Sequence, residues 1–317
     1  MDSGVLRFMQ NSIINVCLAC DDNYAKYAGV VIASALATAS MNDELHFYIL
    51  DGGISEKHKE EILSLKNIKN SEISFVEIDE TLFNEYKKVK THSYISLATY
   101  YRLKLTSLLP EVDKIIYFDC DFIINSSLKE LFQTDMKNFP VAGVHDISRK
   151  MVRKNPTYVN AGMLMFNLKN MREQNLEEKF LNWTKEHIDT IKLGDQEIIN
   201  EVCKGNILIV DDEWNVQSSN FTNRSSYTNR PRAIHYVAKK KPWHFASFSF
   251  HRNLYFKYLQ LTPWALKDDE KDYWLKKNQI ASLIAYFKYR PLFMLRPRFY
   301  EAVFCTYIKP IFGRNTK

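Results

Sequence analysis

The stretch KIIYFDCDFII, residues 114–124, places two aspartates inside an apolar run of strand length. Asp119 and Asp121 have apolar residues on both sides. An ionised carboxylate in such surroundings is costly unless it is paired, hydrogen-bonded or bound to a metal. At the end of a strand, residues i and i+2 point to one face, so both carboxylates can reach one cation. The stretch therefore predicts a buried strand that ends at two acids in need of a partner.

Apolar runs of similar length recur along the chain, and most of them end at an acid or an Asn. They are IINVCLACDD (13–22), LHFYILDGG (45–53), ISFVEID (73–79), KIIYFDCD (114–121), PVAGVHD (140–146), GMLMFNL (162–168) and ILIVDDEW (207–214). Helical patterns lie between them, at 28–39, 55–67, 97–110 and 176–191. Continuous apolar strands that alternate with helices are typical of an α/β fold with a mainly parallel sheet covered on both faces. Ligands of such sheets bind at the carboxyl ends of the strands, where these acids gather.

Composition and cysteine usage indicate a globular protein of a reducing compartment. Of the 317 residues, 46% are apolar and 25% are charged. No uninterrupted apolar run reaches the roughly 18 residues that a membrane-spanning helix needs. The N-terminus lacks the pattern of a signal peptide. Cys17 and Cys20 form a C-x-x-C inside a strand-like run and are expected to be core residues, while Cys120, Cys203 and Cys305 are isolated, so all five are expected to be reduced. We therefore expect a cytoplasmic protein.

The C-terminal part of the chain differs in charge from the rest. Residues 273–317 hold nine Lys and Arg residues and a single acid, Glu301. Tyr, Phe and Trp alternate with the basic residues there. We expect a catalytic domain at 1–264 and a basic, aromatic, helical extension at 265–317. Such an extension fits contact with an anionic membrane surface, binding to nucleic acid, or packing against the domain.

The D-x-D pair by itself fits three interpretations. It can clamp a metal and diphosphate in a nucleotide-sugar transferase, since carboxylate oxygens suit Mg²⁺ or Mn²⁺. It can be the nucleophile pair of a haloacid-dehalogenase-type phosphatase, or a structural cap at the end of a strand. The phosphatase interpretation fails because about a hundred residues of α/β pattern precede the pair. It also fails because Ile123 stands where the phosphatase needs a hydroxyl.

Further polar groups follow other predicted strands. Asp21, Asp22 and Asn23 come between the first strand and a helix, a position that suits a base and a ribose. YVNAGMLMFNL places Asn160, Ala161 and Gly162 before a strand, and Gly allows close approach of the backbone to a ligand (residues 158–168). These groups are expected to meet at the edge of the sheet that holds the D-x-D pair.

Two predicted helices and one late predicted strand add polar and charged groups, each of which has a structural and a functional interpretation. Arg102 in TYYRLKL is either a surface ion pair or a two-pronged donor to a diphosphate. Asp195 and Gln196 in LGDQEIIN begin a helix, as a cap or as ligands of sugar hydroxyls. His235 in AIHYVAKKKPWH is structural or a third metal ligand, and Lys241 then belongs to a basic loop that neutralises phosphate.

The motifs A-x-D-D-N-Y, T-Y-x-R-L-x-L, D-x-D, N-A-G-x-L-x-x-N-L, D-Q-[DE] and H-Y-x(5)-K-P-W-H occur in this order. Together they resemble the family 8 retaining glycosyltransferases, in particular the bacterial lipopolysaccharide and lipooligosaccharide galactosyl- and glucosyltransferases. The resemblance covers about residues 13–250. It implies a GT-A fold, UDP-galactose or UDP-glucose as the donor, and Mn²⁺, or alternatively Mg²⁺, as the metal.

The resemblance also implies a role for each matching residue. The uridine would be held by Ala19, Asp21 and Asn23, the metal by Asp119, Asp121 and His235, and the donor sugar and diphosphate by Arg102, Asn160, Ala161, Asp195, Gln196 and Lys241. Asp195, Gln196 and Arg102 would be catalytic, with Gln196 near the anomeric carbon. One departure concerns the lid, because Ala238 stands where the family usually has Gly. This puts the geometry of lid closure in question.

Family acceptors are often lipid-linked glycans, so the resemblance favours the membrane interpretation of the extension over nucleic-acid binding. We expect a cytoplasmic enzyme at the inner face of the cell membrane that acts in lipopolysaccharide or other surface-glycan synthesis. Two alternatives share the donor motifs. One is a protein-directed glycosyltransferase of the same fold, and the other is a non-catalytic nucleotide-sugar-binding protein.

Overall fold

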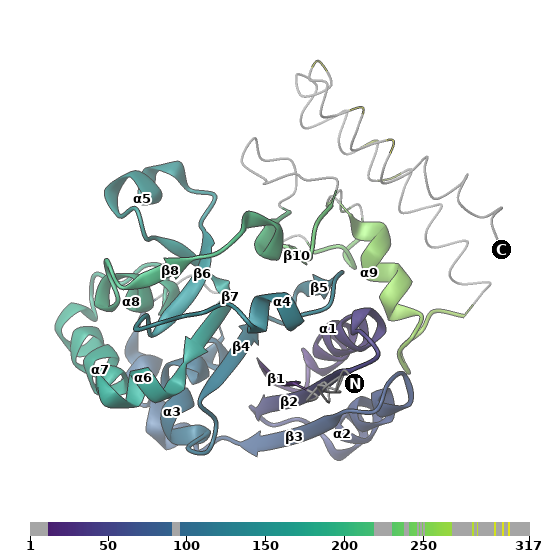
Figure 1. Ribbon diagram of the computed structural model, residues 1–317, viewed down its shortest axis with the longest axis horizontal. Coiled ribbons are helices and arrows are strands. Elements are labelled where there is room, and N and C mark those ends of the chain that lie inside the picture. Colours follow the sequence, from purple (N-terminus) through teal and green to yellow (C-terminus); the bar gives the residue numbers. More distant parts are fainter. Residues whose placement is uncertain are drawn as a thin grey trace, which may run out of the picture.

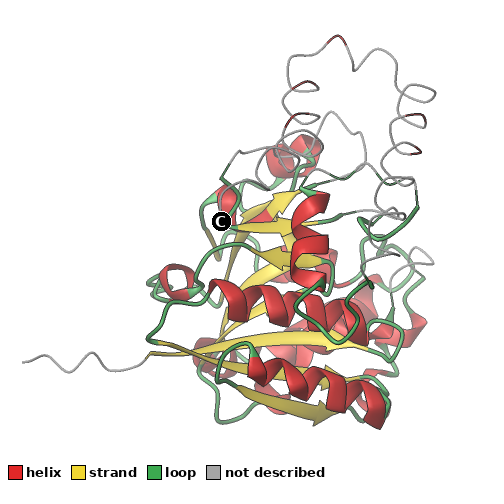
Figure 2. Ribbon diagram, turned by 90° about the vertical axis from the view of Figure 1, so that its right-hand side faces the viewer, coloured by secondary structure: helices red, strands yellow, loops and turns green. Residues whose placement is uncertain are grey.

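The computed structural model describes residues 12–90, 96–218, 230–237, 241–245, 247, 249 and 251–267, with single residues 281, 284, 295, 300 and 304 beyond them. The chain forms an α/β body around a twisted sheet with helices on both faces (Figures 1 and 2). Most of the predicted extension and the lid residue Ala238 lie outside the described residues. The predicted domain boundary after residue 264 therefore stays a prediction.

All seven predicted strands form one sheet. Its strands are β1 (Ser12–Cys20), β2 (Asp43–Asp51), β3 (Glu72–Glu77), β4 (Lys114–Phe118), β6 (Val141–His145), β7 (Val159–Asn167) and β8 (Ile207–Ile209), in the order β3-β2-β1-β4-β7-β6-β8. Only β7 runs antiparallel to its neighbours, β4 and β6. Its first residues therefore lie at the edge where the other strands end. Because the order reverses between β1 and β4, that edge is the expected place for a ligand cleft.

A second, three-stranded sheet was not predicted from the sequence. It consists of β5 (Phe122–Ile124), β10 (Ala233–His235) and β9 (Val216–Gln217). β5 and β10 are antiparallel, and His235 pairs with Phe122 directly after the D-x-D pair. This pairing brings His235 to the acidic pair although more than a hundred residues separate them in the chain.

Helices cover both faces of the main sheet, and one short helix stands out from the body (Figure 1). They are α1 (Ala25–Thr38), α2 (Glu56–Leu63), α3 (Leu105–Leu108), α4 (Lys129–Phe132), α5 (Arg149–Lys154), α6 (Leu168–Glu173), α7 (Leu176–His187), α8 (Asp195–Val202) and α9 (Arg252–Leu259). The predicted helix at 97–110 is instead a 3₁₀ helix at Leu97–Lys104 followed by α3. Its 3₁₀ part buries Tyr100, Tyr101, Arg102 and Leu103 in succession, so it has no single apolar stripe.

Alternate side chains of the strands supply two cores, one on each face of the sheet. Ile14, Val16 and Leu18 of β1 pack on the face covered by α1 and α2. Cys17 and Ala19 pack on the other face, with the 3₁₀ helix, α6, α7 and α8. Cys17, Cys20, Cys120 and Cys203 are buried and free, as predicted. Among the described residues, no helix combines the length and apolar character that crossing a membrane requires.

Candidate active site

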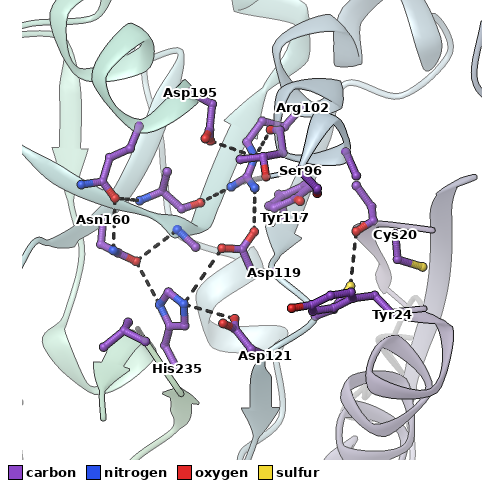
Figure 3. Close-up of a pocket in the computed structure, with 18 of the residues that line it drawn as sticks. Cys20, Tyr24, Ser96, Arg102, Tyr117, Asp119, Asp121, Asn160, Asp195 and His235 are labelled. Carbon is purple, nitrogen blue, oxygen red and sulfur yellow. Dashed lines mark hydrogen bonds and ion pairs between the residues drawn. The ribbon is translucent and has the colours of Figure 1, made fainter. Parts of the chain in front are cut away.

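A pocket of about 400 Å³ opens at the predicted edge of the main sheet. Of the residues predicted to form the site, those that line it are Ala19, Asp21, Arg102, Asp119, Asp121, Asn160, Ala161, Asp195, Gln196, His235 and Lys241. Asn23 does not line it. Its side chain is exposed, and its Nδ2 lies 3.4 Å from Asp21 Oδ2. The structure thus gathers groups from six segments of the chain, as Figure 3 shows for several of them.

The end of β4 meets the start of β7 at the centre of this pocket. The Asp119 N–H donates to the Gly162 carbonyl oxygen at 2.8 Å. Asn160, Ala161 and Gly162 lie inside β7, not before a strand as predicted. A Cβ on Gly162 would lie 2.2 Å from Cε1 of His235. The small size of Gly162 therefore makes room for a protein side chain, whereas the sequence pointed to a ligand.

Asp119, Asp121 and His235 form a cluster that fits a divalent cation. One ligand atom from each lies within 4.8 Å of the others. His235 Nε2 is 3.2 Å from Asp121 Oδ1 and 4.0 Å from Asp119 Oδ2. Asp121 Oδ1 is buried and receives no hydrogen bond from any residue that the structure describes. Two carboxylates and one imidazole are donors that Mn²⁺ or Mg²⁺ accepts.

Hydrogen bonds around Asn160 fix which nitrogen of His235 faces the carboxylates. The Gly162 backbone N–H donates to Asn160 Oδ1 at 3.1 Å, which identifies that atom as the side-chain oxygen. Asn215 Nδ2 donates to the same oxygen at 3.0 Å. His235 Nδ1 also lies 3.0 Å from it, so Nδ1 carries the proton. In the neutral ring Nε2 then has a free lone pair, directed at Asp119 and Asp121 (Figure 3).

Arg102 is a buried cation that organises the opposite wall. Its NH2 group donates to Asp119 Oδ1 at 2.6 Å, its Nε lies 3.2 Å from Asp195 Oδ2, and its NH1 donates to the Ala161 carbonyl. Its guanidinium carbon stands 3.9 Å from the centre of the Tyr117 ring. Burial alone would lower the pKa of Arg102, but the two acids raise it, so the side chain stays charged. The structural interpretation of Arg102 as a surface ion pair is therefore wrong, since its side chain is only 1% exposed.

Asp195 and Gln196 begin α8, as predicted, and are held in different ways. Burial raises the pKa of Asp195 to about 7, although Arg102 opposes the shift. The Gln196 side-chain oxygen accepts from the N–H of Ala161 at 3.1 Å and from Asn160 Nδ2 at 3.2 Å. Its Nε2 donates to Asp146 Oδ2 at 3.3 Å. Both polar ends of Gln196 thus already have protein partners.

Lys241 contacts a metal-ligand candidate directly. Its Nζ forms an ion pair with Asp121 Oδ2 and donates to the Tyr236 carbonyl at 2.7 Å. Burial would raise the pKa of Asp121, but Lys241 and His235 hold it below its usual range. Asp121 is therefore ionised at neutral pH and able to bind a cation.

A model of the family described as Glycosyl transferase family 8 matches residues 15–247. The chain belongs to this family. A relative in Haemophilus influenzae is 32% identical to this family 8 glycosyltransferase over 248 residues, which are 73% of each chain. General stress protein A of Bacillus subtilis is 27% identical over 277 residues, or 80% of this chain and 96% of its own. The Lipopolysaccharide 1,2-glucosyltransferase of Escherichia coli is 25% identical over 289 residues, or 83% of each.

The fold of this family 8 glycosyltransferase is the GT-A fold of a solved relative. The crystal structure of the galactosyltransferase LgtC in complex with donor and acceptor sugar analogs superposes with a TM-score of 0.69. The match covers 82% of this chain and 99% of that chain, at 24% sequence identity. The prediction of the fold class is therefore confirmed, including the mainly parallel sheet.

Sequence reasoning assigned no role to one residue at the β1 end of the pocket of this family 8 glycosyltransferase, and it expected a role in base binding for another that lies outside the pocket. Tyr24 lines the pocket and is 43% exposed, so its ring is free to stack on a planar ligand. An aromatic residue directly after the Asp-Asp-Asn run was the available signal. Asp22, in contrast, accepts from the Ser55 N–H at 2.8 Å and lies 2.6 Å from His58 Nδ1. It ties the loop to α2, and it does not line the pocket as a base-reading group would.

Proposed function

We propose that this family 8 glycosyltransferase transfers a hexose, galactose or glucose, from a UDP-sugar to a glycan hydroxyl with retention of anomeric configuration and dependence on Mn²⁺. The observation that carries the proposal is the cluster of Asp119, Asp121 and His235 beside the buried Arg102. The cluster provides ligands for a cation, and Arg102 provides a fixed positive charge in the same pocket.

Each end of the pocket suits one part of such a donor. Ala19, Asp21 and the ring of Tyr24 would hold the uridine, since an aromatic ring stacks on a base and a carboxylate accepts from ribose hydroxyls. The metal would supply a Lewis acid that binds diphosphate oxygens. Asn160, Ala161 and Asp195 would line the hexose at the other end.

Cleavage of the bond between the sugar and UDP leaves negative charge on the β-phosphate. Lys241 is close enough to the metal ligands to reach this phosphate once its contact with Asp121 is exchanged. Arg102 sits among Asp119, Asp195 and the Ala161 carbonyl, so it would fix these groups around the donor sugar. Fixed cations that face developing charge lower the barrier without reorganisation during the reaction.

Retention without a covalent intermediate fits the hydrogen bonding of Gln196. A covalent route needs a nucleophile on the face opposite the leaving group. Gln196 is an amide, and its oxygen already accepts from the Ala161 N–H and from Asn160. We therefore favour attack by the acceptor hydroxyl on the face that UDP leaves, with the departing phosphate oxygen taking the hydroxyl proton.

The acceptor is proposed to be a lipid-linked glycan, in lipopolysaccharide or other surface-glycan synthesis, at the cytoplasmic face of the membrane. The E. coli relative is named for transfer to lipopolysaccharide. In the predicted extension, the alternation of aromatic and basic residues in the sequence is the feature that supports contact with an anionic membrane surface.

Release of UDP from a panel of UDP-sugars, with and without Mn²⁺ and candidate glycans, tests the proposal. We expect release from UDP-galactose or UDP-glucose that requires Mn²⁺ and is lost in Asp119→Asn and Asp121→Asn. NMR of the product should show an α linkage from an α-linked donor. Failure to release UDP from any UDP-sugar would overturn the proposal.

A further inference from the structure

Helix α5 stands out from the body of the molecule between β6 and β7 (Figure 1). Its sequence is RKMVRK, and none of its six residues is buried. Helices normally repay the loss of chain entropy by burying an apolar face. Only Met151 and Val152 of α5 are partly buried, so packing accounts for little of this segment.

Two hydrogen-bonded junctions hold the ends of α5 to the active site. At the first, Asp146 Oδ1 accepts from the Ser148 N–H at 2.7 Å, while its Oδ2 accepts from Gln196 at 3.3 Å and from Asn160 at 3.4 Å. One carboxylate thus joins the start of α5 to two residues of the pocket.

The second junction joins the other end of α5 to the helix that carries Asp195 and Gln196. Asn155 Nδ2 donates to the Asn200 carbonyl of α8 at 3.3 Å. Asn155 is 4% exposed and Asn200 is fully buried. α5 therefore has a fixed position beside the hexose end of the pocket, at the carboxyl edge of the sheet.

Four cations occupy this fixed position without acidic partners among the described residues. Arg149, Lys150, Arg153 and Lys154 are all exposed. None of them forms an ion pair with any acid in the described part of the chain, and residues 147–172 contain no Asp or Glu. Arg149 and Arg153 are one helical turn apart, as are Lys150 and Lys154, and like charges at this spacing destabilise a helix. Sequences that disfavour the local structure they adopt are expected mainly at functional sites.

We propose that α5 recognises a phosphate group on the acceptor glycan. The inference rests on the proposed glycosyl transfer, because it assigns the substrate class of that same site. A phosphate monoester carries close to two negative charges and three acceptor oxygens, which suits a group of four cations better than a single carboxylate does. With the donor hexose next to Gln196, an acceptor that reaches the hexose passes α5. Its phosphate then meets Arg149 and its neighbours.

Matched oligosaccharides provide the test. The probes are a phosphorylated core oligosaccharide from deacylated lipopolysaccharide and the same oligosaccharide after dephosphorylation with aqueous hydrogen fluoride. Calorimetric titration in the presence of UDP and Mn²⁺ gives the affinity of each. We expect the phosphorylated form to bind about tenfold more tightly at low salt, and the difference to shrink as salt screens the charges.

The variant Arg149→Gln/Lys150→Gln/Arg153→Gln/Lys154→Gln should lose this preference and keep its UDP-sugar hydrolysis rate. The pair Arg149→Gln/Arg153→Gln should lose part of it and serves if the fourfold variant does not fold. A control in which four exposed lysines outside the pocket become Gln should behave as the wild type; these are Lys57, Lys88, Lys179 and Lys185.

Equal binding of the two oligosaccharides by the wild type, or an unchanged preference in the fourfold variant, would overturn the inference. Loss of binding to phosphatidylglycerol vesicles in that variant, with the oligosaccharide preference intact, would show a membrane contact and would also overturn it. Absence of UDP-sugar hydrolysis in the wild type would instead contradict the proposed transfer reaction, so the two failures are distinguishable.

Discussion

His235 Nδ1 lies 3.0 Å from Asn160 Oδ1, and this contact decides what His235 can bind. Because the Gly162 backbone N–H donates to the same oxygen, the proton of the neutral imidazole must be on Nδ1. Nε2 is then the nitrogen with a free lone pair, and it faces Asp119 and Asp121. A hydrogen bond on the far side of an imidazole also raises its basicity as a metal ligand.

Asn160→Ala is expected to weaken Mn²⁺ binding about 10- to 100-fold, the usual effect of removing the partner of a ligand histidine. Electron paramagnetic resonance of free Mn²⁺ measures this without any donor or turnover. Ser96→Ala is the control, because Ser96 lines the same pocket and, among the described residues, forms no hydrogen bond with Asn160 or His235. Equal Mn²⁺ affinity of the wild type and Asn160→Ala would contradict a positioning role.

Gly162→Ala is expected to displace the His235 ring and abolish tight Mn²⁺ binding, because the new Cβ would lie 2.2 Å from Cε1. Gly29→Ala is a matched control, since its Cβ would meet the Trp264 ring at the same 2.2 Å, away from the cluster. Overpacking should lower the free energy of unfolding of both variants by about 1–3 kcal/mol. Chemical denaturation checks this, and only Gly162→Ala should lose the metal.

Gln196→Ala should slow transfer and still leave measurable turnover, because Gln196 orders the pocket through Ala161, Asn160 and Asp146 rather than attacking the sugar. Intact-protein mass spectrometry during turnover should find no glycosylated enzyme in the wild type. A hexose adduct on Gln196 would refute front-face attack.

Arg102→Lys is expected to lower the free energy of unfolding nearly as much as Arg102→Met does. The reason is that an ammonium cannot reach Asp119, Asp195 and the Ala161 carbonyl together. Removing one partner from a buried charge cluster typically costs about 3–5 kcal/mol. Unfolding in urea, with the surface variant Arg172→Lys for comparison, measures this. An unfolding free energy of Arg102→Lys equal to that of the wild type would show that the several hydrogen bonds of the guanidinium do not stabilise the fold.

The parts of the fold that the sequence predicted are those with a continuous physical signal. Buried parallel strands read as apolar runs, and all seven runs became strands of the main sheet. Acids at the ends of those runs marked the pocket, because polar groups inside apolar segments need a partner. The start of α8 at Asp195 was also visible, as an acidic residue directly after Gly194.

Other features depend on contacts between distant segments and leave no local pattern. The strands β5, β9 and β10 have three, two and three residues, too few to show alternation. Their pairing sets His235 beside Phe122 only in the folded chain. In the same way, the sequence shows Gly162 without showing that the His235 ring fills the space of a side chain. The resemblance to the family predicted His235 as a metal ligand, and the structure places its ring beside Asp119 and Asp121.

Asp195 predicts a pH dependence of stability with a definite sign. Its pKa is about 7 in the fold and near 3.8 in the unfolded chain, so between about pH 4 and 7 the folded state binds the proton more tightly. The free energy of unfolding should therefore fall as pH rises through this range, by a few kcal/mol at most. Asp195→Asn removes this term, so its stability relative to the wild type should increase from pH 4.5 to 7.5. Asp79→Asn is the control: hydrogen bonds from Thr81 lower the pKa of Asp79, so its titration lies below this range and its offset from the wild type should stay constant. Urea unfolding in EDTA at several pH values decides the matter, and parallel curves for wild type and Asp195→Asn would show that Asp195 ionises normally in the fold.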